Sequence, residues 1–326
     1  GRLLWIQDAY TTTDRYPYSR PSDEKFNYIR NSVKVVIDAY NGTLEFYIAD
    51  PQDPLVMTYA NIFPTLFRPI DHMASDLRAH LRYPVDLFSI QAATYLQYHM
   101  TDSTVFFNKE DQWSIPSERF FDRQQSVMPY YVIMTLPDED MIEFVLILPF
   151  TPAEKPNMVA WLAARMDGDH YGQLMAFYFP RGMQIYGPVQ IEARIDNDTE
   201  ISQQFTLWDQ SGSQVIRGNL LVIPLGETIL YVEPIYLQAE GVALPELKRV
   251  ILASSTRVVM EKTLEEAVKA LLDRPSDSGS ATVIGEGDAL QQVEEIKETL
   301  RNLREGVLTL EEAIDQLAEQ LEEGKQ

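Results

Sequence analysis

The stretch VKVVIDAYNGTLEFYIA at residues 33–49 decides the fold class of this chain. Two runs rich in β-branched and aromatic residues, 33–39 and 43–49, lie on either side of Asn41 and Gly42. Such runs favour strands, and Asn-Gly favours a tight turn in which both central residues adopt positive φ. The stretch therefore predicts an antiparallel β-hairpin.

Helical signals follow this hairpin directly. Asp53 is a good helix N-cap and Pro54 suits the first helical position, so a helix is expected to begin there. Residues 54–107 are predicted to be mainly helical, because apolar residues recur there at spacings of three and four. Further helices are expected at 156–166, 187–208 and 264–272.

Other apolar segments predict strands, and the polar segment 10–25 predicts a loop. The expected strands are 2–7, 129–136, 142–150, 173–180, 213–225 and 228–237. This alternation predicts an α+β fold with mixed or antiparallel sheets, built from β-hairpins with inserted helical blocks.

The C-terminal part of the chain has a different composition. Residues 1–272 are expected to form the α+β domain, and the Ser-, Gly- and Asp-rich residues 273–288 a flexible linker. Residues 289–323 predict a helical hairpin with two apolar seams, resembling a coiled coil. Two helices cannot build a core alone. The hairpin is therefore expected to pack on its own domain, on a second copy as a homo-oligomer, or on another protein.

Charge and composition exclude several classes of function. The chain has 27 basic and 49 acidic residues, a net charge of −22, and no cysteine. Nucleic-acid binding needs a basic surface, so no nucleic acid is expected as a partner. Disulfides and cysteine metal sites are excluded. No stretch offers the roughly 20 apolar residues of a membrane-spanning helix.

Several long strings of sequence carry a resemblance to a known family. Examples are WIQDAYTTTDRYPYS at 5–19, PFTPAEKPNMVAWLAARMDGDHYG at 149–172 and LYVEPIYLQA at 230–239. Together with strings between them, they resemble the bacterial Uncharacterised Protein Family 0182 over residues 1–272. The resemblance implies a multi-pass protein of the cell membrane, with spanning helices followed by a large soluble region. This chain would then be part of an extracytoplasmic soluble region whose partner is its own N-terminal membrane segment.

The family carries no known catalytic residue, so candidate sites come from the residues themselves. His99 lies three residues before Asp102, a spacing that allows a carboxylate to orient an imidazole for catalysis. Asp167, Asp169 and His170 surround a glycine and form the densest set of possible divalent-cation ligands. In both places the alternative is ordinary loop chemistry, in which the carboxylates accept backbone N–H groups.

A third candidate is a recognition surface. Asp8, Tyr10 and Tyr16 lie in a segment rich in Thr, Tyr and Pro, and exposed tyrosines offer rigid aromatic area with a polar tip. The alternative is that they anchor the loop.

Three functions remain open from the sequence. The first is a non-catalytic module that binds or organises envelope partners, because the chain contains no catalytic motif. The second is a metal-assisted hydrolase that uses the His and Asp candidates with a divalent cation. The third is a sensor or accessory domain of a transporter.

Overall fold

The structure, a computed structural model, describes residues 2–273 except 23–24, 122, 138, 140, 181, 211–212, 226–227 and 240–243. Its contacts divide the chain into two compact units. Unit 1 comprises the described residues of Gly1–Trp113, Val145–Leu148 and Leu162–Phe177, and unit 2 comprises Ser114–Phe144, Pro149–Trp161 and the described residues from Tyr178 on.

The hairpin at 33–49 is present in unit 1. β2 (Tyr28–Asp38) pairs antiparallel with β3 (Leu44–Ile48). The predicted two-residue primed turn is wrong, because five residues separate the strands and, of Asn41 and Gly42, only Gly42 has positive φ. The Asp38 carboxylate accepts the backbone N–H groups of Tyr40 and Asn41, which stabilises this longer loop.

The first strand is longer than predicted. β1 (Leu4–Thr13) pairs antiparallel with β2 along its whole length, with a register shift between Ala9 and Thr11. Residues 10–13 were expected in a loop because they are polar. They form a strand because threonine is β-branched and β2 offers a complete ladder of partners. Beyond β3, α1 (Pro54–Ile62) leads to β4 (Phe67–Pro69), which joins β3 in parallel and makes the sheet mixed.

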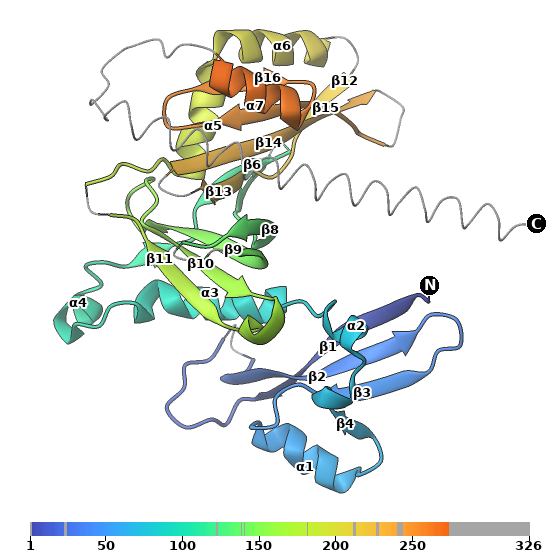
Figure 1. The fold of residues 1–326 in the computed structure, drawn as a ribbon. Coiled ribbons are helices and arrows are strands. Elements are labelled where there is room, and N and C mark those ends of the chain that lie inside the picture. The colour runs from blue at the N-terminus through green and yellow to red at the C-terminus, as the bar shows by residue number, and fades with distance from the viewer. Residues whose placement is uncertain are drawn as a thin grey trace, which may run out of the picture. The chain divides into compact units, whose positions relative to one another are not determined.

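Further helices complete unit 1 (Figure 1). They are η1 (Ile70–His72), α2 (Ser75–Arg78), α3 (Val85–Tyr98), α4 (Ser103–Asn108) and η2 (Gly168–His170). Met73 and Leu81, which flank α2, pack against Val36 and Tyr47 of the four-stranded sheet. One face of this sheet is therefore covered. The buried polar residues of β2, described below, lie on that face.

A second sheet has the strand order β11-β10-β9-β5, with β8 also paired to β9. Its strands are β5 (Trp113–Ser114), β8 (Tyr130–Thr135), β9 (Ile142–Pro152), β10 (Ala160–Arg165) and β11 (Leu174–Tyr178). The helix predicted at 156–166 is wrong, since this segment contains β10. Every residue of β10 is buried, and a strand buried on both faces shows the same continuous apolar run as a buried helix.

Unit 2 has a sheet between two helical layers (Figure 1). Its order is β12-β14-β15-β16, with β13 paired to β14. The strands are β12 (Ser213–Arg217), β13 (Leu221–Leu225), β14 (Thr228–Ala239), β15 (Glu246–Ala253) and β16 (Val258–Glu261). Residues of α5 (Pro188–Asn197) and α6 (Thr199–Gln210) pack on the face that contains Ile229 and Tyr231. α7 (Leu264–Asp273) packs against Leu230 and Leu252 on the other face. A β6–β7 hairpin (Ser117–Phe120 and Arg123–Ser126) also belongs to this unit.

The architecture confirms the predicted α+β class with mixed and antiparallel sheets. The helices expected at 187–208 and 264–272 are also present. The linker at 273–288 lies outside the described residues except for Asp273, which ends α7, and the hairpin at 289–323 lies outside them entirely. Among the described helices, none combines the length and apolarity needed to cross a bilayer.

Candidate functional site

Polar side chains line one face of β2. Ser32, Lys34 and Asp38 are all buried and alternate along the strand, so they lie on the same face of the sheet. Buried polar groups need partners. Each of these three residues lies in a different local network, and one of the networks borders a pocket.

The first network surrounds Asp53, the N-cap of α1. Its carboxylate accepts hydrogen bonds from Thr11, Ser32 and Tyr28, each at 2.6 Å, and from two backbone N–H groups of α1. Burial alone would raise the pKa of Asp53, but the hydrogen bonds from Ser32, Thr11 and Tyr28 lower it to about 2. Burial and the neighbouring Asp53 raise the pKa of Tyr28 to about 12, so this phenol remains a donor. The network joins β1, β2 and α1 and is structural.

The second network surrounds Lys34, whose side chain is 2% exposed. Its ammonium pairs with Asp8 of β1, lies 3.4 Å from the carbonyl oxygen of Arg82, and lies 5.6 Å from the ring centroid of Tyr171. Burial lowers the pKa of Lys34, while the charge of Asp8 opposes that shift. The lysine is thus held in place by one carboxylate.

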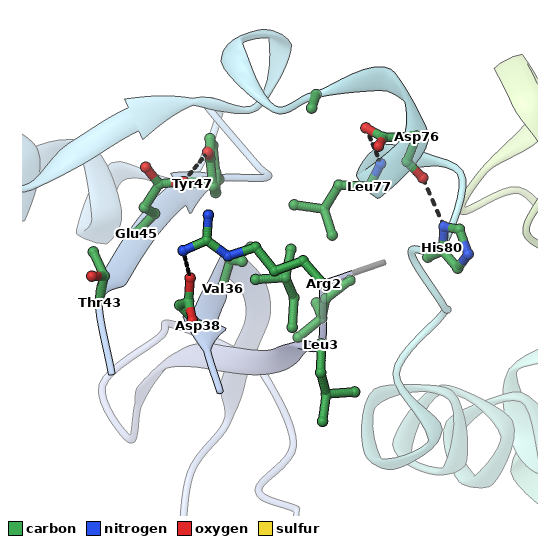
Figure 2. A pocket seen from close by; sticks show the side chains of 13 residues that line it. Arg2, Leu3, Val36, Asp38, Thr43, Glu45, Tyr47, Asp76, Leu77 and His80 are labelled. Atoms are coloured by element: carbon green, nitrogen blue, oxygen red, sulfur yellow. Dashed lines mark hydrogen bonds and ion pairs between the residues drawn. The ribbon is translucent and has the colours of Figure 1, made fainter. Parts of the chain in front are cut away.

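A pocket of about 570 Å³ lies over the same sheet face, on the side of Asp38. Figure 2 shows Arg2 extending towards Asp38, with Glu45 and Tyr47 on one side and Asp76 and His80 on the other. Its polar groups are largely paired with one another. Asp38 pairs with Arg2, Glu45 accepts from Tyr47 at 2.6 Å and from Arg68 at 2.6 Å, and His80 Nδ1 lies 2.7 Å from the Asp76 carbonyl oxygen. These pairs stabilise the pocket walls and leave few groups for a ligand.

A second pocket of about 570 Å³ lies between the 16–29 segment and α3, and we call it the tyrosine groove. Its described lining consists of Tyr16, Pro17, Tyr18, Ser19, Arg20, Pro21, Ser22, Phe26, Asn27, Tyr28, Ile29, Ile90, Ala93, Thr94, Leu96, Gln97, Tyr98 and Gln112. Three of its tyrosines are exposed: Tyr16 at 52%, Tyr18 fully, and Tyr98 at 56%. Exposed aromatic rings in a concave site are typical of recognition surfaces.

Two of the three exposed rings of the tyrosine groove, Tyr16 and Tyr98, pack against other aromatic rings of the protein. Tyr16 stacks on Tyr28 with a centroid distance of 5.3 Å and an interplanar angle of 21°, and the Tyr28 hydroxyl is anchored by Asp53. The Asn27 side chain accepts from the backbone N–H of Tyr16 and donates to its carbonyl oxygen. Tyr98 packs against Phe106 at 5.4 Å. Such preorganisation lowers the entropy cost of binding.

Tyr18 adds a backbone feature to the groove. Its φ is 60°, in the left-handed region that non-glycine residues rarely adopt, and its side chain is fully exposed. Strained residues of this kind cluster at ligand-binding sites. The strain at Tyr18 is therefore consistent with recognition at this loop.

The histidine candidate His99 is held by backbone groups. Nδ1 lies 3.0 Å from the carbonyl oxygen of Tyr95 and Nε2 lies 2.9 Å from that of Asp111, and the ring stacks on Trp113 at 3.7 Å. Asp102 is the N-cap of α4 and accepts the N–H groups of Thr104 and Val105. The structure therefore gives the two residues separate, local partners.

The metal candidates Asp167, Asp169 and His170 lie at η2. The His170 N–H donates to the Asp167 carbonyl oxygen at 3.1 Å. In the part of the chain that the structure describes, no three His, Asp or Glu side chains form a group that could hold a metal ion.

The recognition candidates separate into two places. Asp8 and Tyr10 lie in β1 rather than in a loop, and Asp8 pairs with the buried Lys34. Tyr16 is exposed and lines the tyrosine groove. Sequence reasoning did not identify Lys34, Tyr18 or Tyr98 as site residues. A lysine within the apolar run VKVVI was a usable signal for a buried charge, whereas nothing local links Tyr98 to the loop at 16–29.

Sequence comparison with known proteins identifies the family of this chain. A family model described as "Uncharacterised protein family (UPF0182)" matches residues 1–208. One relative called "UPF0182 protein", from Pelotomaculum thermopropionicum, is 57% identical over 83% of this chain and 30% of the relative. Another with the same name, from Moorella thermoacetica, is 56% identical over 86% of this chain and 31% of the relative. One from Methanospirillum hungatei is 50% identical over 88% of this chain and 34% of the relative. The chain thus spans about a third of the length of these relatives. No solved structure matches it. The chain belongs to the Uncharacterised protein family UPF0182.

Proposed function

We propose that this chain is the extracytoplasmic, non-catalytic recognition module of a longer membrane protein, and that it binds an envelope component through the tyrosine groove. The observation that carries the proposal is the set of exposed rings in that groove, of which Tyr16 and Tyr98 are held by packing against other rings. Family membership adds support, because the relatives are about three times as long as this chain and leave room for membrane segments.

The chemistry of the other candidate sites also favours recognition over catalysis. The ring nitrogens of His99 face carbonyl oxygens, and Asp102 caps a helix. The metal-assisted hydrolase and the transporter sensor remain sequence-based predictions without a specific supporting contact. A divalent cation that raises the melting temperature, with loss of the effect in Asp169→Ala, would favour the hydrolase.

The proposed extracytoplasmic location of this chain is tested by cysteine labelling in cells. This chain has no cysteine, so Tyr18→Cys introduces one thiol at a fully exposed position. In the full-length protein, with any cysteines elsewhere replaced, a membrane-impermeant maleimide is expected to label Tyr18→Cys in intact cells. Labelling only after lysis would contradict an extracytoplasmic location. Tyr40→Cys, at another exposed position, is the matched control for accessibility.

The recognition role is tested by photocrosslinking in the same cells. A photoreactive phenylalanine analogue at Tyr18 is expected to give a reproducible adduct with an envelope component, because this side chain lines the groove. The same analogue at Tyr40, which is exposed but outside the groove, should not give that adduct. Identical patterns at both positions, or no adduct at Tyr18, would contradict the proposal.

We also propose that residues 289–323 drive self-association. Deletion of 275–326 should then convert an oligomer into a monomer, as measured by native mass. An unchanged native mass would reject this role.

A further inference from the structure

The described lining of the tyrosine groove differs in charge from the whole chain. The chain carries a net charge of −22, yet no Asp or Glu is among the described residues that line the groove. Its one charged described residue, Arg20, donates a hydrogen bond from Nη1 to the Gln97 side chain at 2.9 Å. The described lining therefore offers one positive charge and does not present the multiple charges that a strongly ionic ligand would need.

The groove offers aromatic faces together with neutral polar groups. Tyr16, Tyr18 and Tyr98 are exposed in the groove, and the hydroxyl group of a phenol can both donate and accept a hydrogen bond. The face of an aromatic ring carries partial negative charge, which attracts weakly positive C–H groups. A ligand with C–H faces and hydroxyl edges would satisfy both kinds of group.

We propose that the tyrosine groove binds an uncharged oligosaccharide, with sugar rings stacked on Tyr16, Tyr18 and Tyr98. This inference rests on the proposed function and names its ligand class. Sugar rings have C–H faces and edges of hydroxyl groups, which match the exposed rings and the neutral donors and acceptors. The volume of about 570 Å³ lies within the usual range for ligand sites and accommodates a short oligosaccharide.

A proline-rich peptide is the main competing ligand, because such peptides also dock on aromatic grooves. Proline has no backbone N–H, so such a peptide offers carbonyl acceptors and few donors. Sugar hydroxyl groups both donate and accept, as the tyrosine hydroxyl groups of the groove do. This match favours a sugar over a proline-rich peptide.

The test is calorimetric titration of the full 326-residue chain with three neutral probes, cellotetraose, maltotetraose and triacetylchitotriose, and with a decaproline peptide. At least one sugar is expected to bind with a stoichiometry of one. Tyr16→Ala, Tyr18→Ala and Tyr98→Ala should each weaken binding by about tenfold, because each removes a stacking surface. Tyr16→Phe keeps the ring and should stay within about threefold of the parent.

Two controls separate binding from folding. Tyr40→Ala removes an exposed tyrosine outside the groove and should leave the affinity unchanged. Tyr18 is fully exposed, so Tyr18→Ala should keep the melting temperature of the parent even if Tyr16→Ala does not. Binding that is unaffected by Tyr18→Ala and Tyr98→Ala would overturn the inference.

The remaining outcomes distinguish this inference from the proposed function. If no sugar binds, the oligosaccharide inference is overturned. Binding of decaproline instead of any sugar would identify a peptide groove, which overturns the inference and leaves the recognition function in place. An adduct from Tyr18 in cells, without sugar binding in the titration, would likewise overturn the inference and leave the recognition function in place. Sugar binding without any adduct in cells would contradict only the envelope partner.

Discussion

Arg217 and Glu233 form a two-point ion pair in the interior of unit 2. Nε of Arg217 lies 2.5 Å from Oε1 of Glu233 and Nη2 lies 2.8 Å from Oε2, and Glu233 is fully buried. The remaining Nη1 group donates to Asp196 at 2.6 Å, at the end of α5. One arginine thus joins β12, β14 and α5.

Breaking this pair on one side should cost far more than replacing both residues. Arg217→Met leaves a buried carboxylate without its partner and should lower the free energy of unfolding by about 3–5 kcal/mol. The double variant Arg217→Met/Glu233→Leu should lose clearly less, because no buried charge remains. Urea unfolding of the parent, both single variants and the double variant measures the coupling. Additive losses would contradict this account.

The stability of unit 2 should fall as pH rises through the range set by Glu192. Burial raises the pKa of Glu192 from 4.5 to about 7, although the Arg119 backbone N–H at 2.5 Å favours the charged form. Between about pH 4.5 and 7 the unfolded chain loses this proton while the folded chain keeps it, so stability declines across that window. Glu192→Gln should remove this slope and stabilise the protein above pH 7 by roughly 3 kcal/mol.

Unfolding free energies measured at several pH values, for the parent and for Glu192→Gln, test this prediction. Glu200→Gln is the control, because Glu200 is an exposed glutamate in the first turn of α6. An unchanged pH profile in Glu192→Gln would show that this carboxyl is not the source of the slope.

The hydrogen bonds around Asp53 should contribute strongly to the stability of unit 1. Asp53→Ala removes the N-cap of α1 and leaves Thr11, Ser32 and Tyr28 without their common acceptor. The loss of a cap and of buried hydrogen bonds should cost about 3 kcal/mol. Because the pKa of Asp53 is lowered to about 2, its stabilisation is complete above about pH 4 and is lost as pH falls through about 2.

The matched control for Asp53 is Asp50→Ala. Asp50 pairs with Arg30 at 2.7 Å at the surface, so its removal should cost about 1 kcal/mol or less. Thermal unfolding of both variants compares the two effects. Equal losses would contradict a special role for Asp53.

Removing the Asp8 carboxylate beside Lys34 should lower the stability of the protein and make that stability rise with pH. In Asp8→Asn the buried ammonium loses its only carboxylate among the described contacts, and the variant should be less stable by about 2 kcal/mol at neutral pH. Burial already lowers the pKa of Lys34, and this change should lower it further. The folded variant then binds fewer protons than the unfolded chain below pH 10.5, so its stability should rise with pH.

Unfolding measured from about pH 7 to about pH 9 tests this rise. Tyr171 also faces the ammonium, and burial raises the pKa of its hydroxyl, so it stays neutral in that range. The double variant Lys34→Met/Asp8→Asn should show no rise. The same slope in the double variant would assign the effect to another group.

Local signals were sufficient for many elements. The strand pair of the hairpin at 33–49 and the α1 start at Asp53 depend on neighbours within a few residues, and the structure confirms both. The same local reasoning was wrong at β10, because Ala160–Arg165 has good helix formers but is buried on both faces between β9 and β11.

The sequence by itself determined the α+β class, the strongly acidic net charge and the family. It also drew attention to Tyr16, through the composition of its segment. Only the tertiary structure placed Tyr98 of α3 beside Tyr16 and Tyr18 and committed Asp8 to Lys34. The physical reason is that helix caps and turns are governed by adjacent residues, whereas a groove or a buried ion pair forms when packing brings distant segments together.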